Sequence, residues 1–399
     1  MKCVEYNWTQ LEEETVDLRR EIHRYAELGG QETRTAALVK QFAQALDLPV
    51  VTMEGTGLVV ILDTGMPGRH LALRADMDAL PIVESPNNTA GPKACISDDP
   101  KTCHACGHDA HTAMLLCAMK ELAQRRSLLR GTVYFCFEQG EENRSGYQAM
   151  MDTLARYHID SVWGMHVMSS LPSGKVGICP GAISTGVIPI SFDITGKGGH
   201  SSRPDQCRNP LVPAAAFVGS AYTALYNALP PGSTVSMALT TIHCGTARNV
   251  IAESALVEGC MRYQDLQEGL LAKETVKAVA EAVAHAHGCT VSFHTVMESG
   301  YIPVHNDETC TARAQAVAAD LWGADYFDVS CGMGGSESFG YYTERYPGVF
   351  VTLGTGNVEK GSTASHHHPQ FDIDEDMLIR GVQLTAAYAE TYLTEEVSQ

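Results

Sequence analysis

The chain has 399 residues, of which 44% are hydrophobic and 19% charged, and a formal net charge of −19 at pH 7. This length provides material for two or three domains, and the composition is that of a globular protein. The acidic balance argues against nucleic acid and membrane surfaces as partners, because both require basic patches. There is no apolar leader and no run of about 18 apolar residues, so we expect a cytoplasmic protein. Its 13 cysteines then fit reduced thiols better than a disulfide framework.

The first part of the chain predicts an α/β arrangement whose strands end in polar residues. We expect helices over about 9–28, 33–45 and 109–124 and buried strands over 70–74, 131–137 and 159–165. The first strand leads to Asp76 and Asp78, the second to Glu141 and Glu142, and the third to His166. Each of these residues alone is also typical of a turn or a core position. All of them are expected at one sheet edge, where open α/β sheets bind ligands. This agreement is a stronger indication of a functional site than any one of these residues alone.

Residues 103–111 (CHACGHDAH) hold two thiols, three imidazoles and a carboxylate. This density of soft and borderline metal ligands favours a metal site over the alternative, a thiol-rich helix start. A zinc finger or ribbon would need a second ligand pair at a set distance, and residues 112–120 are instead an apolar helix. The segment therefore predicts an open, catalytic metal site whose other ligands come from farther along the chain.

From about residue 185 the pattern changes to β-α-β-β-α-β, the order of a ferredoxin-like unit. The glycine-rich loop 196–204 lacks the GxGxxG spacing of a dinucleotide fold. The predicted fold is therefore α/β. It has a catalytic domain over 1–184 and 299–399, with a mixed sheet flanked by helices, and an inserted ferredoxin-like α+β domain over 185–298.

Three adjacent histidines at 366–368 lie between a buried strand (348–353) and the last helix (about 373–394). A purification tag would stand at a chain end, so an internal triplet at this place favours a ligand role. A second glycine-rich loop covers 332–339, before a short helix.

Seven segments, in this order, resemble the metal-dependent aminoacylase/carboxypeptidase family. Its most similar branch is the amidohydrolases that include hippurate hydrolase and indole-acetyl-amino-acid hydrolases. The segments are LRADMDALPI (73–82), HACGHDAHTAMLL (104–116), EQGEE (138–142), GMHV (164–167), GKGGH (196–200), GMGGSESF (332–339) and HHPQFDIDE (367–375).

The resemblance implies a hydrolase with two divalent metal ions per subunit, zinc or manganese, with cobalt or nickel as further possibilities. By position, the residues that resemble metal ligands are Cys106, His108, Glu142, His166 and His367. His367 is chosen from the three histidines because the family pattern is His-x-Pro. Glu141 resembles the general base, and Asp78 the aspartate that orients the site.

The same resemblance implies that the inserted domain, 185–298, is a lid and dimerisation domain with three residues that contact substrate. His200 matches the histidine that contacts the reacting carbonyl oxygen, and Asn249 and Arg262 match residues that hold a free carboxylate. Asp76 stands where other branches have a metal-binding histidine, so we expect Cys106 to replace the lost ligand. The chain departs from the family at EQGEE (usually QPAEE), at 201–203 and at Ser338. The last two departures, at Arg203 and Ser338, are expected to affect which acyl or amino-acid group fits.

The predicted reaction is hydrolysis of the amide bond of an N-acyl-amino acid to a carboxylic acid and a free amino acid. It would run through a metal-bound hydroxide with Glu141 as general base. A dipeptidase or carboxypeptidase of the same family is the alternative. A non-catalytic relative is disfavoured because the base and every ligand are present. A zinc module that binds nucleic acid is disfavoured because the net charge of the chain is negative. The family also implies a homodimer in which His200 often acts in the partner's site.

Overall fold

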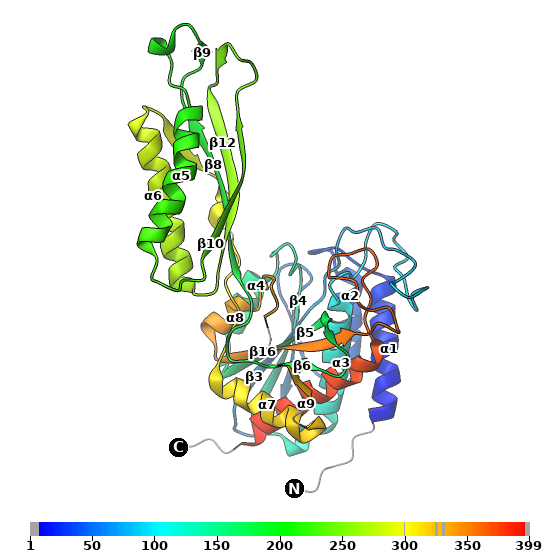
Figure 1. The fold of residues 1–399 in the computed structure, drawn as a ribbon. Helices are drawn as coiled ribbons and strands as arrows, with labels where there is room; N and C mark the ends of the chain where they lie inside the picture. Colours follow the sequence, from blue (N-terminus) through cyan, green and yellow to red (C-terminus); the bar gives the residue numbers. More distant parts are fainter. Residues whose placement is uncertain (1–7, 299, 324–325, 329–331, 396–399) are drawn as a thin grey trace. The chain divides into compact units, whose positions relative to one another are not determined.

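The computed structural model describes residues 8–298, 300–323, 326–328 and 332–395 (Figure 1). The chain forms two compact units, the first over Met1–Ile183, His305–Gly332 and Tyr341–Gln399 and the second over Ser184–Val304 and Met333–Gly340. Residues 299–304 and 333–340 thus belong to the second unit, whereas the sequence placed them in the catalytic domain. Backbone pairing is the reason, because Val187 N donates to Tyr301 O (2.9 Å) and Thr185 N to Gly335 O (3.0 Å).

The first unit is built on an eight-stranded mixed sheet of order β1-β2-β4-β3-β5-β16-β6-β15. Four central strands, β4, β3, β5 and β16, run parallel to one another, so their carboxyl ends meet at one edge. The strands are β1 Val50–Thr52, β2 Leu58–Asp63, β3 His70–Asp76, β4 Thr132–Glu138, β5 Ser161–Pro172, β6 Val176–Gly177, β15 Phe327–Asp328 and β16 Gly348–Gly356. The mixed sheet of the prediction is confirmed.

Helices cover this sheet, and α3 is the most enclosed of them (Figure 1). It packs against α1, α9 and β3, which is why almost every side chain from His108 to Met119 is buried. Trp163 of β5 stacks on Tyr388 of α9 with 4.3 Å between ring centroids. The helices are α1 Trp8–Arg24, α2 Thr33–Ala45, α3 His108–Gln124, α4 Tyr147–Leu154, α7 Glu308–Trp322, α8 Gly340–Arg345 and α9 Leu378–Thr394. Within the described residues, no helix has the length and apolarity to cross a membrane.

The second unit has the predicted ferredoxin-like order β8-α5-β10-β12-α6-β13. Its antiparallel sheet has the spatial order β10-β12-β8-β13. Helices α5 and α6 pack together over a separate core that contains Phe192 and Phe217. The elements are β8 Gly186–Thr195, α5 Leu211–Ala228, β10 Ser236–Cys244, β12 Ser254–Tyr263, α6 Leu266–Ala286 and β13 Thr290–Phe293. A small ribbon of β9 (Gly199–His200) and β11 (Val250–Ile251) lies beyond one end of this sheet.

The expectation of reduced thiols holds for the ten cysteines that are free in the described part of the chain. It is wrong for Cys179, which is disulfide-bonded. In the sequence Cys179 stands beside an apolar run, which gives no indication of a disulfide.

Candidate metal centre

The loop before α3 places two of the predicted ligands. Gly107 stands between Cys106 and His108 with φ 88°, a backbone conformation that favours glycine. A side chain here would also collide with Val167 of β5. The tight turn therefore brings the thiol of Cys106 and the ring of His108 against the middle of β5, where His166 lies.

Donor atoms of the predicted ligands gather in two groups that share one thiol. Cys106, His108 and His166 form one group, and Cys106, Glu142 and His367 form the other; within each group the atoms lie within 4.8 Å of one another. Cys106 Sγ is 3.6 Å from His166 Nε2, and His367 Nε2 is 3.1 Å from Glu142 Oε1. Residues separated by up to 261 positions in the sequence thus meet at one place.

Asp78 fixes the orientation of His108. Its Oδ1 is 3.0 Å from His108 Nδ1, while Oδ2 accepts a hydrogen bond from Glu142 N at 3.0 Å. A carboxylate on Nδ1 leaves the lone pair of Nε2 for a metal ion. His108 Nε2 is buried and has no hydrogen-bond partner among the described residues, which is the arrangement that a bound cation would satisfy.

His166 and His367 are oriented by the backbone. His166 Nδ1 is 2.6 Å from Val167 O, so Nε2 is the nitrogen that faces Cys106. His367 has φ +63°, a conformation that costs a non-glycine residue about 1–3 kcal/mol, and its N–H donates to Ala105 O at 2.8 Å. This strained residue is therefore tied directly to the loop that holds Cys106.

The neighbouring histidines of the triplet have other partners. His366 Nε2 is 3.0 Å from Val167 O, and His368 Nδ1 accepts from Gln370 N at 3.1 Å. Among the three, His367 is the residue that joins a candidate metal group.

Asp76, His108 and His111 form a further cluster of possible ligands, but its groups already have partners. His111 Nδ1 is 2.6 Å from Asp76 Oδ1, and His111 Nε2 accepts from Val167 N at 2.9 Å. Arg74 Nη1 donates to Asp76 Oδ2 at 2.8 Å. Asp76 therefore anchors the arginine and His111, which fits the expectation that a ligand other than Asp76 is needed.

Glu141 lies in the same place. Its carboxylate belongs to a group with His108 and Glu142, and the side chain is buried. It follows β4 in the segment where the sequence predicted a base and a ligand side by side.

The electrostatics of the donor set fit a divalent cation. Burial raises the pKa of the Cys106 thiol well above its ordinary value, and the charge of Glu142 raises it further. Burial lowers the pKa of His166 well below its ordinary value, which keeps this ring neutral. Neutral imidazole is the form that binds metals, and a buried thiol loses its proton when a metal binds. One thiol, three imidazoles and a carboxylate are a donor set suited to zinc and other first-row transition metals.

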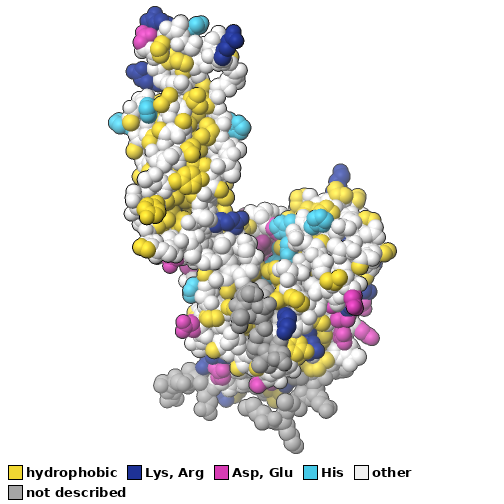
Figure 2. Space-filling model, in the orientation of Figure 1, with side chains coloured by type: hydrophobic (Ala, Val, Ile, Leu, Met, Phe, Trp, Pro, Cys, Tyr) yellow, Lys and Arg dark blue, Asp and Glu magenta, His cyan; other side chains and the backbone are white. Residues whose placement is uncertain are grey.

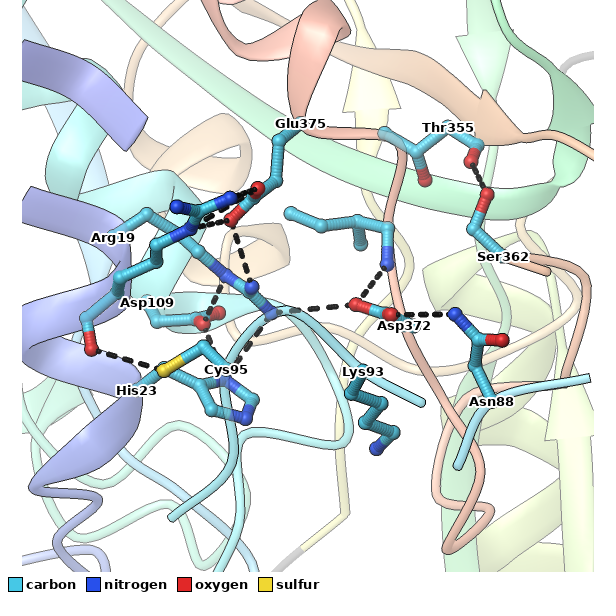
Figure 3. Close-up of polar contacts among 12 residues, drawn as sticks. Arg19, His23, Asn88, Lys93, Cys95, Asp109, Thr355, Ser362, Asp372 and Glu375 are labelled. Atoms are coloured by element: carbon cyan, nitrogen blue, oxygen red, sulfur yellow. Dashed lines mark hydrogen bonds and ion pairs between the residues drawn. The ribbon is translucent and has the colours of Figure 1, made fainter. Parts of the chain in front are cut away.

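A buried ionic network supports the two chain segments that hold ligands (Figure 3). Arg19 of α1 is 1% exposed and contacts Asp109 (2.7 Å), Glu375 (3.1 Å) and Asp372 (3.8 Å). Asp109 follows the ligand candidate His108, and the two other acids follow His367. A single guanidinium thus links segments that are about 260 residues apart, between Asp109 and Asp372.

The three predicted substrate contacts lie in the second unit. His200 is exposed in β9 and pairs with Val250, next to Asn249. Its Nδ1 accepts from Ser202 N at 3.2 Å, so Nε2 carries the hydrogen and can donate. Arg262 is exposed near the end of β12, where Nη1 donates to Thr185 Oγ1 at 3.1 Å.

His200 and Asn249 stand at the opposite end of this unit from Arg262. Asn249 precedes β12, whereas Arg262 is its second-last residue. A strand rises about 3.3 Å per residue, so the length of β12 alone separates the two ends by roughly 25 Å. Within one chain these residues cannot hold the same small molecule.

The sequence did not indicate several buried partners of the centre. Arg74 bonds Glu138 (2.9 Å), and Tyr342 donates to the same carboxylate (2.7 Å). The signal available was the charge of Arg74 inside an apolar strand, because a buried charge requires a partner.

Ser338 and Arg203, the two residues expected to affect substrate specificity, lie in different surroundings. Ser338 is fully buried, and its hydroxyl donates to Glu337 Oε1 at 3.3 Å. Arg203 is exposed and pairs with Asp205.

Comparison with known proteins shows which family has this fold and centre. The model of peptidase family M20/M25/M40 matches residues 72–391, and the chain belongs to this family, as the resemblance implied. Thermostable carboxypeptidase 1 of Saccharolobus solfataricus is 30% identical over 388 residues, 95% of each chain.

Other relatives are amide hydrolases by name. The chain is 32% identical over 394 residues to the IAA-amino acid hydrolase ILR1-like 2 of Arabidopsis thaliana, covering 96% of this chain and 86% of the relative. It is 31% identical over 381 residues to the N-acetylcysteine deacetylase of Bacillus subtilis, covering 94% and 95%. A crystal structure from Bacillus subtilis, described as a dinuclear metal-binding peptidase of the M20 family, matches with TM-score 0.80 and 28% identity, covering 96% and 99%.

Proposed function

We propose that this chain is a metal-dependent amidohydrolase that cleaves N-acyl-amino acids to a carboxylic acid and a free amino acid. The observation that carries the proposal is the pair of donor groups that share Cys106, beside the carboxylate of Glu141. The names of two relatives, a hydrolase of an acylated amino acid and a deacetylase, support this substrate class.

The proposed cofactors are two divalent ions per subunit, zinc or manganese, with cobalt or nickel as alternatives. Cys106, His108 and His166 would hold one ion. The same thiol with Glu142 and His367 would hold the other. Such ions, when bound, supply Lewis acidity that lowers the pKa of water and polarises a carbonyl group.

Glu141 is the proposed general base. Its carboxylate takes a proton from the attacking water and passes it to the leaving amine, which requires one group placed within reach of both. Its burial among charged neighbours excludes bulk water from this transfer. A positioned base of this kind contributes about 10²–10⁴-fold to the rate.

Substrate contacts are assigned to the second unit. The planar fork of Arg262 suits a free carboxylate better than lysine would. The N–H at Nε2 of His200 is proposed to stabilise the negative charge that develops on the amide oxygen, which is worth roughly 3–4 kcal/mol. Asn249 would add an amide contact to the carboxylate.

The distance between these residues supports a homodimer in which His200 and Asn249 act in the partner's site. Strand β10 lies at the edge of its sheet and pairs only with β12 among the described strands. Apolar side chains gather on the surface of this unit (Figure 2). Its exposed apolar residues include Tyr222 and Tyr226 of α5 and Ile242 of β10 itself. An exposed edge strand beside apolar surface is the kind of face that a second copy covers.

The alternative function is a dipeptidase or carboxypeptidase of the same family, which the carboxypeptidase relative supports. Both activities cut an amide next to a free carboxylate. The deciding experiment reconstitutes the apoprotein with defined metals and compares turnover of N-acetyl- and N-benzoyl-amino acids with that of dipeptides. Higher kcat/KM on the acylated amino acids supports the proposal, and the reverse order supports the alternative.

A further inference from the structure

The segment EQGEE, where the chain departs from its family, is held by carboxylates on both sides of Glu141. The N–H of Gly140 donates to Glu32 Oε1 at 2.7 Å. On the other side, the N–H of Glu142 donates to Asp78 Oδ2 at 3.0 Å. The residues before and after Glu141 therefore each donate a backbone N–H to an almost fully buried acid, since Glu32 is 0% and Asp78 1% exposed.

Glu32 belongs to a closed set of hydrogen bonds. Its Oε2 accepts from the hydroxyl of Thr56. Gln139, which directly precedes Gly140, turns its side chain back and accepts at Oε1 from Thr56 N and from Gly57 N, the latter at 2.8 Å. Glu32, Thr56 and Gln139 therefore connect the start of α2, the loop before β2 and the segment after β4.

The backbone of the segment depends on glycine at this place. Gly140 has φ +55°, and a Cβ there would collide with Ser145 Oγ. The turn closes through Ser145 N to Gly140 O (3.0 Å) and Arg144 N to Glu141 O (3.1 Å). The family pattern has proline at the position of Gln139 and alanine at that of Gly140. Proline could not make the hydrogen bonds of the Gln139 side chain, and alanine could not adopt this φ without strain.

We propose that Glu32 is a positioning residue, which acts with Thr56 and Gln139 to fix the main chain that carries Glu141. The role rests on the proposed function, because it assumes that Glu141 is the base. Glu32 touches no donor atom of the metal groups and is shielded from solvent, so it acts through the peptide of Gly140. A displacement of about 1 Å in a catalytic group can cost on the order of 10²-fold in rate.

A purely structural role is the competing explanation, because Glu32 also stands at the start of α2. Glu27 provides the matched control. Its carboxylate accepts from Arg34 N (2.9 Å) and Thr35 N (2.9 Å) at the same helix end. Among the described residues, the Glu27 carboxylate bonds only to residues 33–35 and not to residues 139–142, so its removal reports the loss of α2 anchoring alone.

The experiment compares Glu32→Ala, Glu32→Gln, Thr56→Val and Glu27→Ala with the unmodified protein, each loaded with metal. For Glu32→Ala we expect kcat to fall about 10- to 100-fold, with KM within about 2-fold. We also expect an unchanged number of bound metal ions. Glu32→Gln should recover most of kcat, because its amide oxygen still accepts from Gly140 N and its NH₂ can donate to Thr56. Thr56→Val should lose part of kcat, which keeps the test valid if Glu32→Ala does not fold.

Three results would overturn the positioning role. They are an unchanged kcat in folded Glu32→Ala and Thr56→Val, a loss of kcat in Glu27→Ala as large as in Glu32→Ala, or a kcat that falls only in step with metal content. A failure of the proposed function looks different, since the unmodified protein would then be inactive or Glu141→Gln would keep full turnover.

Discussion

The two units hold their functional side chains in opposite ways. In the first unit the candidate ligands and the base stand on a strand, at a helix start and in the loops beside them. His108, Glu141 and His166 are buried, Cys106 and Glu142 are half-buried and His367 is exposed, and most of them have a second contact that sets their orientation. His108, held by Asp78, is 1% exposed. In the second unit His200, Asn249 and Arg262 are exposed and stand on a two-residue strand, a loop and a strand end. The difference indicates a rigid centre for the chemistry and a separate surface that brings contacts to the substrate.

The largest effect is expected at the adjacent acids of the rigid centre. Glu141→Gln should lower kcat by about 10²–10⁴-fold while the metal content stays the same, because an amide cannot take up the proton. Glu142→Gln should instead lose metal, because its carboxylate oxygen faces His367 at 3.1 Å. Metal analysis with turnover on one N-acyl-amino acid separates the two roles. Equal metal loss in both variants would contradict the assignment.

The network in Figure 3 tests whether the centre depends on buried support. Arg19→Met removes the guanidinium 2.7 Å from Asp109 and leaves this buried carboxylate with His23, also at 2.7 Å, and breaking such a buried ion pair costs about 3–5 kcal/mol of stability. Arg34→Met is the control, since the side chains of Arg34 and its partner Glu21 are 54% and 43% exposed and an exposed pair contributes little to stability. Urea unfolding measures the free energy of unfolding of both variants. Similar losses in the two variants would count against the network.

The exposed surface of the second unit is tested by mixing two defective variants. His200→Ala and Arg262→Ala should each lose most of kcat/KM but keep their metal. If His200 serves the partner's site, one site of each mixed dimer is intact. Equal mixing with subunit exchange should then restore about a quarter of the unmodified activity. No recovery, in a mixture where mixed dimers are shown to form, would place both residues in the same chain's site.

A smaller effect is expected from pH. Burial alone would raise the pKa of Glu84, but the contacts with His23 and Lys93 lower it to about 2. Because the folded-state pKa is lowered, the Glu84 carboxylate contributes to the free energy of unfolding above pH 4.5, its ordinary pKa. This contribution is lost as the pH falls towards 2. After discounting for partial solvent exposure, it is about 2 kcal/mol. The difference in unfolding free energy between unmodified apoprotein and Glu84→Gln should shrink over this range. A constant difference would contradict the shift.

The sheet and the location of the centre could be predicted because strand direction and side-chain chemistry are local properties of the sequence. Asp76 and Glu138 stand opposite each other in the parallel pair of β3 and β4, as residues at matching strand ends must. The choice of His367 among the three adjacent histidines required the family pattern, since all three offer the same imidazole ligand.

Other features depend on contacts between distant segments, which no local pattern encodes. Glu32 looks like an ordinary residue before a helix, and its bond to Gly140 joins positions 108 apart. The grouping of residues 333–340 with the second unit follows from pairing with Thr185. The disulfide of Cys179 likewise has no signal in an apolar run.

Calorimetric titration of the apoprotein with a divalent metal tests the shared thiol most directly. We predict two ions per subunit for the unmodified protein, loss of both in Cys106→Ala, and loss of one in His166→Ala, because Cys106 belongs to both donor groups and His166 to one. Two ions retained in Cys106→Ala, or none bound by the unmodified protein, would contradict a pair of metal sites built around this residue.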